Sequence, residues 1–308
     1  MVTSAVSVRS AVALAICATA SVVLPGTAVA QAPGCTAAQV ETVLPGATPL
    51  DFAENLGHDA DGNLWVSRVF RNVVQRYDSA GRVTAEVAVD APGAVRLGPD
   101  GELYVVYGDS SAGLLPGAHG SGVVRFDPRA EHPVPQRFVS GLGMANGAAF
   151  DSAGDLYVAD TAHGVVRVRT GGSIDADWSR QAVVAGANGL AVQGDSVYVT
   201  EYQSLTGRIV RIPIDRPWDR TTVADVTVGG APVTALPDDL TVGADGMLYD
   251  ATTVGRVVRV DPSGRAGMCT VADLGIPVTS VARVPEDDRS LLVSTVTGGV
   301  LRIHLASG

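Results

Sequence analysis

Lysine is absent from this 308-residue sequence, whose 22 basic residues are all arginine. Schiff-base catalysis needs a lysine amine and is therefore excluded. The motif G-x-S-x-G is also missing, which argues against a serine hydrolase with a nucleophile elbow. Basic residues are too few to balance the acidic ones, and the formal net charge of −10 argues against nucleic acids and anionic membranes as partners.

Long apolar runs are confined to the N-terminus. Residues 1–30 contain one arginine, Arg9, followed by an apolar stretch at 11–24 and an A-V-A sequence at 28–30. This order is typical of a secretory signal peptide that is cleaved after residue 30, and the apolar stretch is too short to span a membrane. We therefore predict that 1–30 is a signal peptide, that 31–308 forms a single domain, and that the protein is secreted into the extracellular or periplasmic space.

Cysteine is scarce, and Cys17, one of the three in the chain, lies in the predicted signal peptide. The other two, Cys35 and Cys269, would meet an oxidising compartment, where an isolated pair usually forms a disulfide. We predict a Cys35–Cys269 disulfide, with two free buried thiols as the alternative. Cys35 lies well past the apolar stretch and follows Pro33-Gly34, which argues against a lipid anchor there.

Strand-like segments and turns fill the rest of the chain and recur every 39 to 53 residues. Each copy has an apolar segment, a short polar turn and an apolar segment around an aromatic residue, followed by an alternating segment around an arginine, such as GVVRFD. The aromatic (or leucine) anchors of the six copies are Trp65, Tyr104, Tyr157, Tyr198, Tyr249 and Leu292. Such alternation is the period of a β-strand, and no segment after residue 31 has a convincing helical period.

Four antiparallel strands that repeat every 40 to 50 residues are typical of a β-propeller blade. The six copies therefore predict an all-β protein, a six-bladed β-propeller with four antiparallel strands per blade. The sixth copy ends after its third strand, so we predict that an N-terminal strand within 39–46 supplies the fourth and closes the ring. The predicted disulfide would secure this closure. A seven-bladed ring is the alternative, since two gaps between anchors are long, although residues 107–122 have the composition of a loop.

The first strand of each propeller blade lines the central channel, so equivalent positions in these strands converge on one axis. Eleven residues before the anchors stand Glu54, Gly93, Asn146 and Asp238, and Asn188 takes this position in a copy whose turn is one residue shorter. Four of these five carry the hard oxygen atoms that Ca²⁺ and Mg²⁺ prefer. Any one of them alone would be an ordinary turn residue. Their shared register predicts a common site, in which a cation would offset the repulsion between carboxylates.

These residues resemble those of the senescence marker protein/gluconolactonase (regucalcin-like) family of six-bladed propellers. The motifs that carry the resemblance are Glu54-Asn55-Leu56, Asn146-Gly147, Asn188-Gly189-Leu190-Ala191 and Pro237-Asp238. The resemblance covers roughly residues 45–305. This chain departs from the family at two places. The family often has Glu-Gly-Pro around the glutamate, where this chain has Glu54-Asn55-Leu56. It often has Pro-Asp-Gly around the aspartate, where this chain has Pro237-Asp238-Asp239.

The resemblance implies that Glu54, Asn188 and Asp238 bind one divalent cation, Ca²⁺ before Mg²⁺, Mn²⁺ or Zn²⁺. It implies that Asn146 contacts the substrate or the cation, and that Asp238 is also the catalytic base in the hydrolysis of a lactone or related ester. His163, which follows the second strand of its copy, is a further candidate for contact with the substrate. A substrate-binding arginine cannot be placed by motif.

We therefore expect a secreted, metal-dependent, gluconolactonase-like hydrolase that acts as a monomer on a small-molecule substrate, without nucleic acid and without membrane insertion. Asn146 and Asn188 would orient the substrate carbonyl and stabilise the developing oxyanion. Two alternatives stay open. In one, the propeller is a non-catalytic protein that binds a ligand or protein on one face and contains a structural cation. In the other, it is a strictosidine-synthase-like enzyme, which would need a glutamate in a deep apolar pocket that the sequence does not identify.

Overall fold

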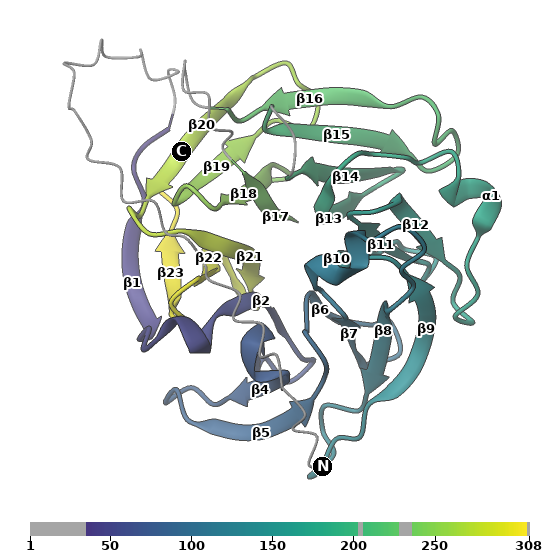
Figure 1. Cartoon of the computed structure of the whole chain (residues 1–308). Helices are drawn as coiled ribbons and strands as arrows, with labels where there is room; N and C mark the ends of the chain where they lie inside the picture. Colours follow the sequence, from purple (N-terminus) through teal and green to yellow (C-terminus); the bar gives the residue numbers. More distant parts are fainter. Residues whose placement is uncertain (1–34, 203–205, 228–235, 307–308) are drawn as a thin grey trace, which may run out of the picture. The chain divides into compact units, whose positions relative to one another are not determined.

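Alternating apolar and polar residues form the strands that the sequence repeats predict. The computed structural model describes residues 35–202, 206–227 and 236–306, which contain 23 β-strands and one short α-helix. The predicted signal peptide at 1–30 lies outside the described residues. The strands form six antiparallel sheets, which are the blades of a six-bladed β-propeller (Figure 1). The predicted fold class and the number of blades are confirmed.

The blades follow one another along the chain, and the first strands of neighbouring blades contact each other around the axis. Blade one contains β2 (Ala53–His58), β3 (Leu64–Arg68), β4 (Val73–Tyr77) and β5 (Val83–Ala88). Blade two contains β6 (Val95–Leu97), β7 (Leu103–Tyr107), β8 (Ser121–Phe126) and β9 (Gln136–Leu142). Blade four contains β13 (Ala187–Gln193), β14 (Ser196–Glu201), β15 (Arg208–Pro213) and β16 (Thr221–Asp225). Blade five contains β17 (Pro237–Val242), β18 (Leu248–Thr252), β19 (Arg256–Val260) and β20 (Met268–Asp273).

Blade three departs from the predicted four strands. It contains β10 (Ala145–Phe150), β11 (Leu156–Asp160) and β12 (Gly164–Val168), and its outer segment carries the α-helix α1 (Ala176–Ser179). The side chain of Asp175 caps α1 by accepting a hydrogen bond from Trp178 N at 3.1 Å. The Trp178 ring is buried against Tyr157, with ring centroids 5.2 Å apart. A capped helical turn with a buried tryptophan thus takes the place of a fourth strand.

Three short 3-10 helices complete the described secondary structure. They are η1 (Pro49–Asp51), η2 (Val69–Arg71) and η3 (Ser111–Leu114). No helix within the described ranges is long and apolar enough to cross a membrane.

The ring closes as the sequence predicts. Blade six consists of β21 (Val278–Val284), β22 (Asp287–Thr295) and β23 (Val300–His304), and its outer strand is β1 (Gln39–Leu44). β1 runs antiparallel to β23, with Gln39 opposite His304. A disulfide joins Cys35, just before β1, to Cys269 in β20, with their Cα atoms 5.9 Å apart. The predicted closing strand and the predicted cysteine pairing are both confirmed.

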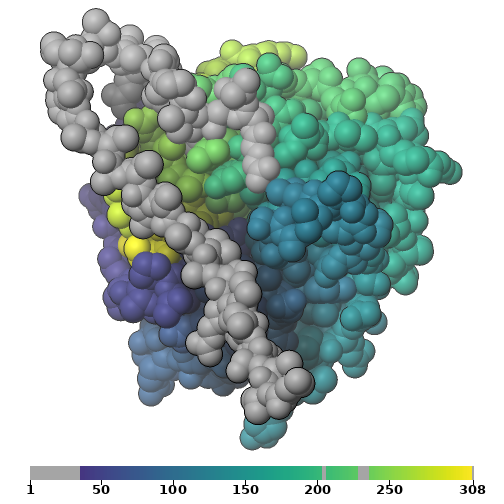
Figure 2. Space-filling model, viewed as in Figure 1, coloured from purple at the N-terminus to yellow at the C-terminus, as the bar shows by residue number. Residues whose placement is uncertain are grey.

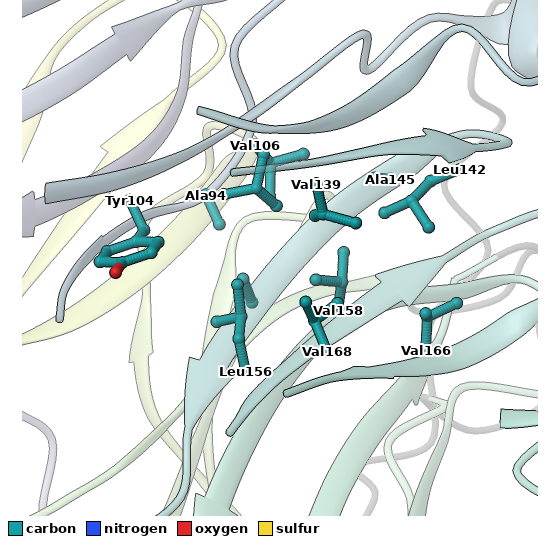
Figure 3. Packing of buried hydrophobic residues seen from close by; sticks show 12 residues of the cluster. Ala94, Tyr104, Val106, Val139, Leu142, Ala145, Leu156, Val158, Val166 and Val168 are labelled. Atoms are coloured by element: carbon teal, nitrogen blue, oxygen red, sulfur yellow. The ribbon is translucent and has the colours of Figure 1, made fainter. Parts of the chain in front are cut away.

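The hydrophobic core lies between neighbouring blades, and Figure 2 shows the outer face of the molecule that these blades form. Between blades two and three, Tyr104 and Val106 of β7 face Leu156 and Val158 of β11 and Val168 of β12 (Figure 3). The aromatic anchors belong to these interfaces: the Trp65, Tyr157 and Tyr249 side chains are among the largest that are fully buried. In four of the repeats the polar atom of the anchor donates a hydrogen bond to an aspartate in the turn of the same repeat: Trp65 Nε1 to Asp59, Tyr104 OH to Asp100, Tyr157 OH to Asp151 and Tyr249 OH to Asp245. The aspartate and the anchor recur together because a buried indole or phenol needs a hydrogen-bond partner.

Asp250 breaks the repeat. The residue after the anchor is Val66, Val105, Val158, Val199 and Val293 in the other five copies. Asp250 is fully buried in β18, and neither of its carboxyl oxygens has a hydrogen-bond partner in the described part of the chain. Burial raises the pKa of Asp250 well above its usual range, and the charge of Asp239 raises it further. The fold therefore favours the neutral form of this carboxyl.

Asp250→Val should raise the free energy of unfolding at pH 7 by about 1–3 kcal/mol, because an unpartnered buried polar group is costly and valine occupies the equivalent position elsewhere in the ring. The folded pKa of Asp250 lies above the unfolded pKa, so the wild type loses stability as pH rises beyond roughly 4, where only the unfolded chain releases this proton. The gain from the substitution should therefore shrink toward pH 3. Urea denaturation between pH 3 and 7 measures it, and a gain that does not vary with pH would contradict the assignment.

The Cys35→Ser/Cys269→Ser variant should lose about 2–4 kcal/mol of unfolding free energy, because the cross-link restrains the segment that closes the ring. Urea denaturation with and without a thiol reductant measures the effect. The reductant should bring the wild type to the stability of the variant and leave the variant itself unchanged. Equal stability of the oxidised and reduced wild type would contradict this prediction.

Candidate active site

Four inner strands place a polar residue at the same position. Glu54, Asn146, Asn188 and Asp238 are the second residues of β2, β10, β13 and β17, and each is buried, with at most 8% of its surface exposed. In all four blades the pairing with the next strand shifts at this point, so that this residue and its successor stand outside the ladder in a β-bulge. The register that aligned these residues in the sequence is therefore the register of the inner strands.

The glycines after Asn146 and Asn188 allow neighbouring inner strands to approach backbone to backbone. A Cβ atom on Gly147 would lie 2.4 Å from the carbonyl oxygen of Asn188, and one on Gly189 would lie 2.3 Å from the carbonyl oxygen of Asp238. Only glycine permits such an approach. The two Asn-Gly pairs are thus required by packing around the axis, and they bring Asn146, Asn188 and Asp238 into succession along the ring.

Asn146 joins two carboxyl groups. Its Nδ2 donates hydrogen bonds to Glu54 Oε1 at 3.0 Å and to Asp109 Oδ2 at 2.9 Å. Asp109 lies between β7 and β8 of blade two, where its backbone N–H donates to the carbonyl oxygen of Ala91 at 3.0 Å. Residues from blades one, two and three thus meet at this side of the site.

Asp238 lies beside hydroxyl groups on the other side of the site. The hydroxyl of Thr253 lies 3.3 Å from Asp238 Oδ2 and 3.3 Å from the hydroxyl of Tyr202. Tyr202 follows β14 and Thr253 follows β18, so both lie in the segments that connect the second and third strands of their blades. A hydroxyl pair from blades four and five therefore stands beside the carboxylate of Asp238.

The electrostatics of the site favour a positive ligand. Burial and the charge of Asp109 raise the pKa of Glu54 well above its ordinary value. Burial and the charge of Glu54 do the same to the pKa of Asp238. Burial raises the pKa of Asp109 to about 6. Carboxyl groups whose pKa values are raised by burial and by neighbouring carboxylates are stabilised in their charged form by a cation.

Asn188 adds a neutral oxygen to the site. Its Oδ1 is buried and has no hydrogen-bond partner among the residues that the structure describes. An orphaned amide oxygen beside acidic groups is a suitable ligand for a hard divalent cation. Within the same residues, no three His, Cys, Asp or Glu side chains converge as a ready-made metal cluster. Glu54, Asn188 and Asp238 therefore fit a cation by their chemistry, with an amide oxygen as part of the donor set.

His163 lies apart from these residues in the described contacts. It is in the turn between β11 and β12, where its Nδ1 is 3.0 Å from Asp160 Oδ2 and its side chain is 52% exposed. Its ring stacks on that of His119, with centroids 6.2 Å apart. The contact of His163 with a substrate stays a prediction.

Sequence reasoning missed Asp109, Tyr202 and Thr253. The register of the inner strands finds only first-strand residues, whereas these three come four or five residues after the anchors Tyr104, Tyr198 and Tyr249. The segment after a second strand lies at the same end of the blade as the start of the first strand. A search of that position for polar residues would have found all three.

No protein-family model matches the sequence, and no curated protein matches it. Solved structures, however, share its fold. A gluconolactonase from Xanthomonas campestris matches with a TM-score of 0.66 and 16% identity, over 87% of this chain and 90% of that chain. Regucalcin from Agrobacterium tumefaciens, a calcium-binding protein, matches with a TM-score of 0.62 and 18% identity, over 86% of this chain and 96% of that chain.

A functionally different protein is also similar. Virginiamycin B lyase from Staphylococcus aureus matches with a TM-score of 0.57 and 12% identity, over 87% of this chain and 100% of that chain. At such identities the likeness concerns the fold, and the fold alone does not fix the reaction. The chain thus has the six-bladed propeller fold of gluconolactonases and regucalcin, as its sequence motifs predicted.

Proposed function

We propose that this protein is a secreted, divalent-cation-dependent hydrolase of a lactone or a related ester. One observation carries the proposal: Glu54, Asn188 and Asp238 occupy the same position of three inner strands, and Asn188 Oδ1 is buried without a partner among the described residues. The fold shared with a gluconolactonase and with a calcium-binding regucalcin supports it. The disulfide supports the secreted location, because such bonds persist in oxidising compartments.

Glu54, Asn188 and Asp238 would hold the cation, which when bound supplies a Lewis acid that polarises the substrate carbonyl. Two carboxylates and an amide oxygen form an all-oxygen donor set. Ca²⁺ accepts such sets in flexible geometry, whereas Zn²⁺ favours nitrogen and sulfur. Ca²⁺ is therefore our first choice, ahead of Mg²⁺, Mn²⁺ and Zn²⁺.

Asp238 is the general base of the proposed reaction. Burial and the charge of Glu54 raise the pKa of Asp238, and a bound cation would offset this and keep the carboxyl in the unprotonated form that a general base needs. Asp238 takes a proton from the attacking water as the water oxygen bonds to the lactone carbonyl carbon. The bond from that carbon to the ring oxygen then breaks, and the ring oxygen leaves as an alcohol with the proton that Asp238 returns. The product is a hydroxy acid.

Tyr202 is the donor to the carbonyl oxygen. Burial and the charge of Asp238 raise its pKa, so the phenol keeps its proton at neutral pH. A hydroxyl donor in this place stabilises the charge that develops on the carbonyl oxygen. Asn146, for which we expected this role, donates its Nδ2 to Glu54 and Asp109. We therefore assign Asn146 the task of holding these two carboxyl groups in place.

Ca²⁺ should raise the melting temperature of the protein. At a concentration 100 times the Kd, the stabilisation is about 2.7 kcal/mol. Glu54→Gln and Asp238→Asn should lose most of this shift, because each removes a charged ligand. Asp177→Asn, at an exposed aspartate of α1, is the control and should keep it. Scanning calorimetry with Ca²⁺ and with a chelator measures the shifts, and equal shifts in all four proteins would count against the site.

The protein should hydrolyse at least one member of a panel of aldonolactones and acyl-homoserine lactones, and a chelator should stop the reaction. Asp238→Ala should lower kcat/KM by about 10²–10⁴ through loss of the base, and Tyr202→Phe by about 10² through loss of the donor. Asp177→Asn should leave the rate unchanged. A pH-stat assay measures the acid released. Unchanged turnover in Asp238→Ala would overturn the mechanism, and Ca²⁺ binding without turnover on any lactone would favour a non-catalytic binding propeller.

A further inference from the structure

The residues that follow the candidate ligands differ among the blades. They are Gly147 and Gly189 in blades three and four, but Asn55 and Asp239 in blades one and five. Asn55 and Asp239 meet each other: Asn55 Nδ2 donates a hydrogen bond to Asp239 Oδ2 at 3.0 Å, although 184 residues separate them. Both are 99% buried. Blades one and five are not neighbours, since blade six lies between them, so this bond crosses the channel.

Arg96 of β6 completes the contact from blade two. Its Nη1 donates to Asn55 Oδ1 at 2.7 Å, and its Nη2 lies 3.2 Å from both carboxylate oxygens of Asp239. Its Nε donates to the carbonyl oxygen of Ala148 in blade three at 2.8 Å. We call Arg96, Asn55 and Asp239 the cross-channel clamp. The planar guanidinium suits this arrangement because its donors form a rigid fork.

The clamp separates the two ends of the channel. A cavity of about 270 Å³ lies on its other side, and Arg96 is part of the wall of this cavity. The rest of the wall is mainly apolar and comes from all six inner strands, with Leu56, Val95, Leu190 and Leu240 among its residues. A buried ion pair gives little net stability compared with apolar packing. Net stabilisation of the fold therefore does not explain why these three polar residues are buried in the channel.

The position of the clamp supplies this explanation. Asn55 directly follows Glu54, and Asp239 directly follows Asp238, within the same two β-bulges. A bulge lacks ladder hydrogen bonds, so the clamp provides the side-chain bonds that hold the two bulges relative to each other. The guanidinium of Arg96 has its bonds to Asn55, Asp239 and Ala148, and these use its three nitrogen atoms. Arg96 is thus a positioning residue rather than a ligand of the substrate.

We propose that the cross-channel clamp fixes the separation of Glu54 and Asp238 and thereby makes the site select Ca²⁺ over Mg²⁺. The inference rests on the proposed function, because it concerns the same cation. Ca²⁺ binds oxygen at 2.3–2.6 Å, whereas Mg²⁺ requires 2.0–2.1 Å and near-octahedral geometry. Carboxylates held apart by a rigid bridge cannot contract around the smaller ion. Without the bonds of the clamp, the two bulges can move closer and their carboxylates can contract around Mg²⁺.

Asn55→Ala tests the clamp, because it removes the link between blades one and five and leaves the Arg96–Asp239 ion pair. The ratio of the Kd for Mg²⁺ to the Kd for Ca²⁺, measured by titration calorimetry, should fall about tenfold, which corresponds to about 1.4 kcal/mol. The matched control is Ser280→Ala. Ser280 donates to the same Asp239 Oδ2 at 2.5 Å but belongs to blade six and does not touch Asn55 in the described contacts. In Ser280→Ala the ratio of the Kd for Mg²⁺ to the Kd for Ca²⁺ should stay within about twofold of the wild-type ratio.

Arg96→Lys is the second variant, for the case in which Asn55→Ala does not fold. It keeps the charge beside Asp239 but cannot bond Asn55 and Asp239 together through a planar fork, so the ratio should fall here too. If the folded Asn55→Ala and Arg96→Lys variants keep the wild-type ratio of the Kd for Mg²⁺ to the Kd for Ca²⁺, the proposed role of the clamp is wrong and the proposed function is unaffected. The same holds if Ser280→Ala lowers this ratio as much as they do. A wild type that binds neither Ca²⁺ nor Mg²⁺ overturns the proposed function and the clamp with it. The binding ratio is measured without substrate, so lack of turnover does not affect the result.

Discussion

The candidate site depends on the antiparallel pairing of β1 with β23. Glu54 belongs to blade one and Asp238 to blade five, so blade six must stay in place between them. The outer strand of blade six comes from the other end of the described chain, and without it β23 would present an unpaired edge. Backbone hydrogen bonds between distant segments, together with the Cys35–Cys269 disulfide, therefore determine the geometry of residues that never touch β1 in the described contacts.

The fold accepts buried carboxyl groups in three different ways. Asp239 is paired with Arg96, which compensates its charge. Burial and neighbouring carboxylates raise the pKa values of Glu54 and Asp238, Asp109 acting on Glu54 and Glu54 acting on Asp238, and both residues lie where a cation would compensate their charge. Asp250 has neither kind of partner in the described part of the chain and is favoured in its neutral form. Functional sites commonly contain such locally unfavourable choices, which the packing between blades must offset.

The sequence predicts most of the fold because the signals for it are local. Alternation, turn residues and the anchors define the blades, and counting back from the anchors finds Glu54, Asn146, Asn188 and Asp238. The prediction of a fourth strand was wrong for blade three. The helical turn at α1 depends on its own capping residue and has no copy in the other blades. The residues that the sequence did not reveal are Asp109, Tyr202, Thr253, Arg96 and the pairing of Asn55 with Asp239. The first three share a position after the second strand that a wider search of the repeat would have found. The contacts of Arg96, Asn55 and Asp239 join segments far apart in the chain, which no local pattern encodes.

Arg96, Asn55 and Asp239 bond to one another between the candidate ligands and the cavity at the other end of the inner strands, so we expect molecules to reach the site from the opposite face. For a lactonase this means that substrate and product share a single opening. A neutral lactone enters, whereas the hydroxy acid formed from it carries a new negative charge near Glu54 and Asp109. Like charges at short range in a poorly solvated space repel strongly. A bound cation would attract the same carboxylate, so release of the product through this opening would depend on the balance between the cation and the acidic residues around it.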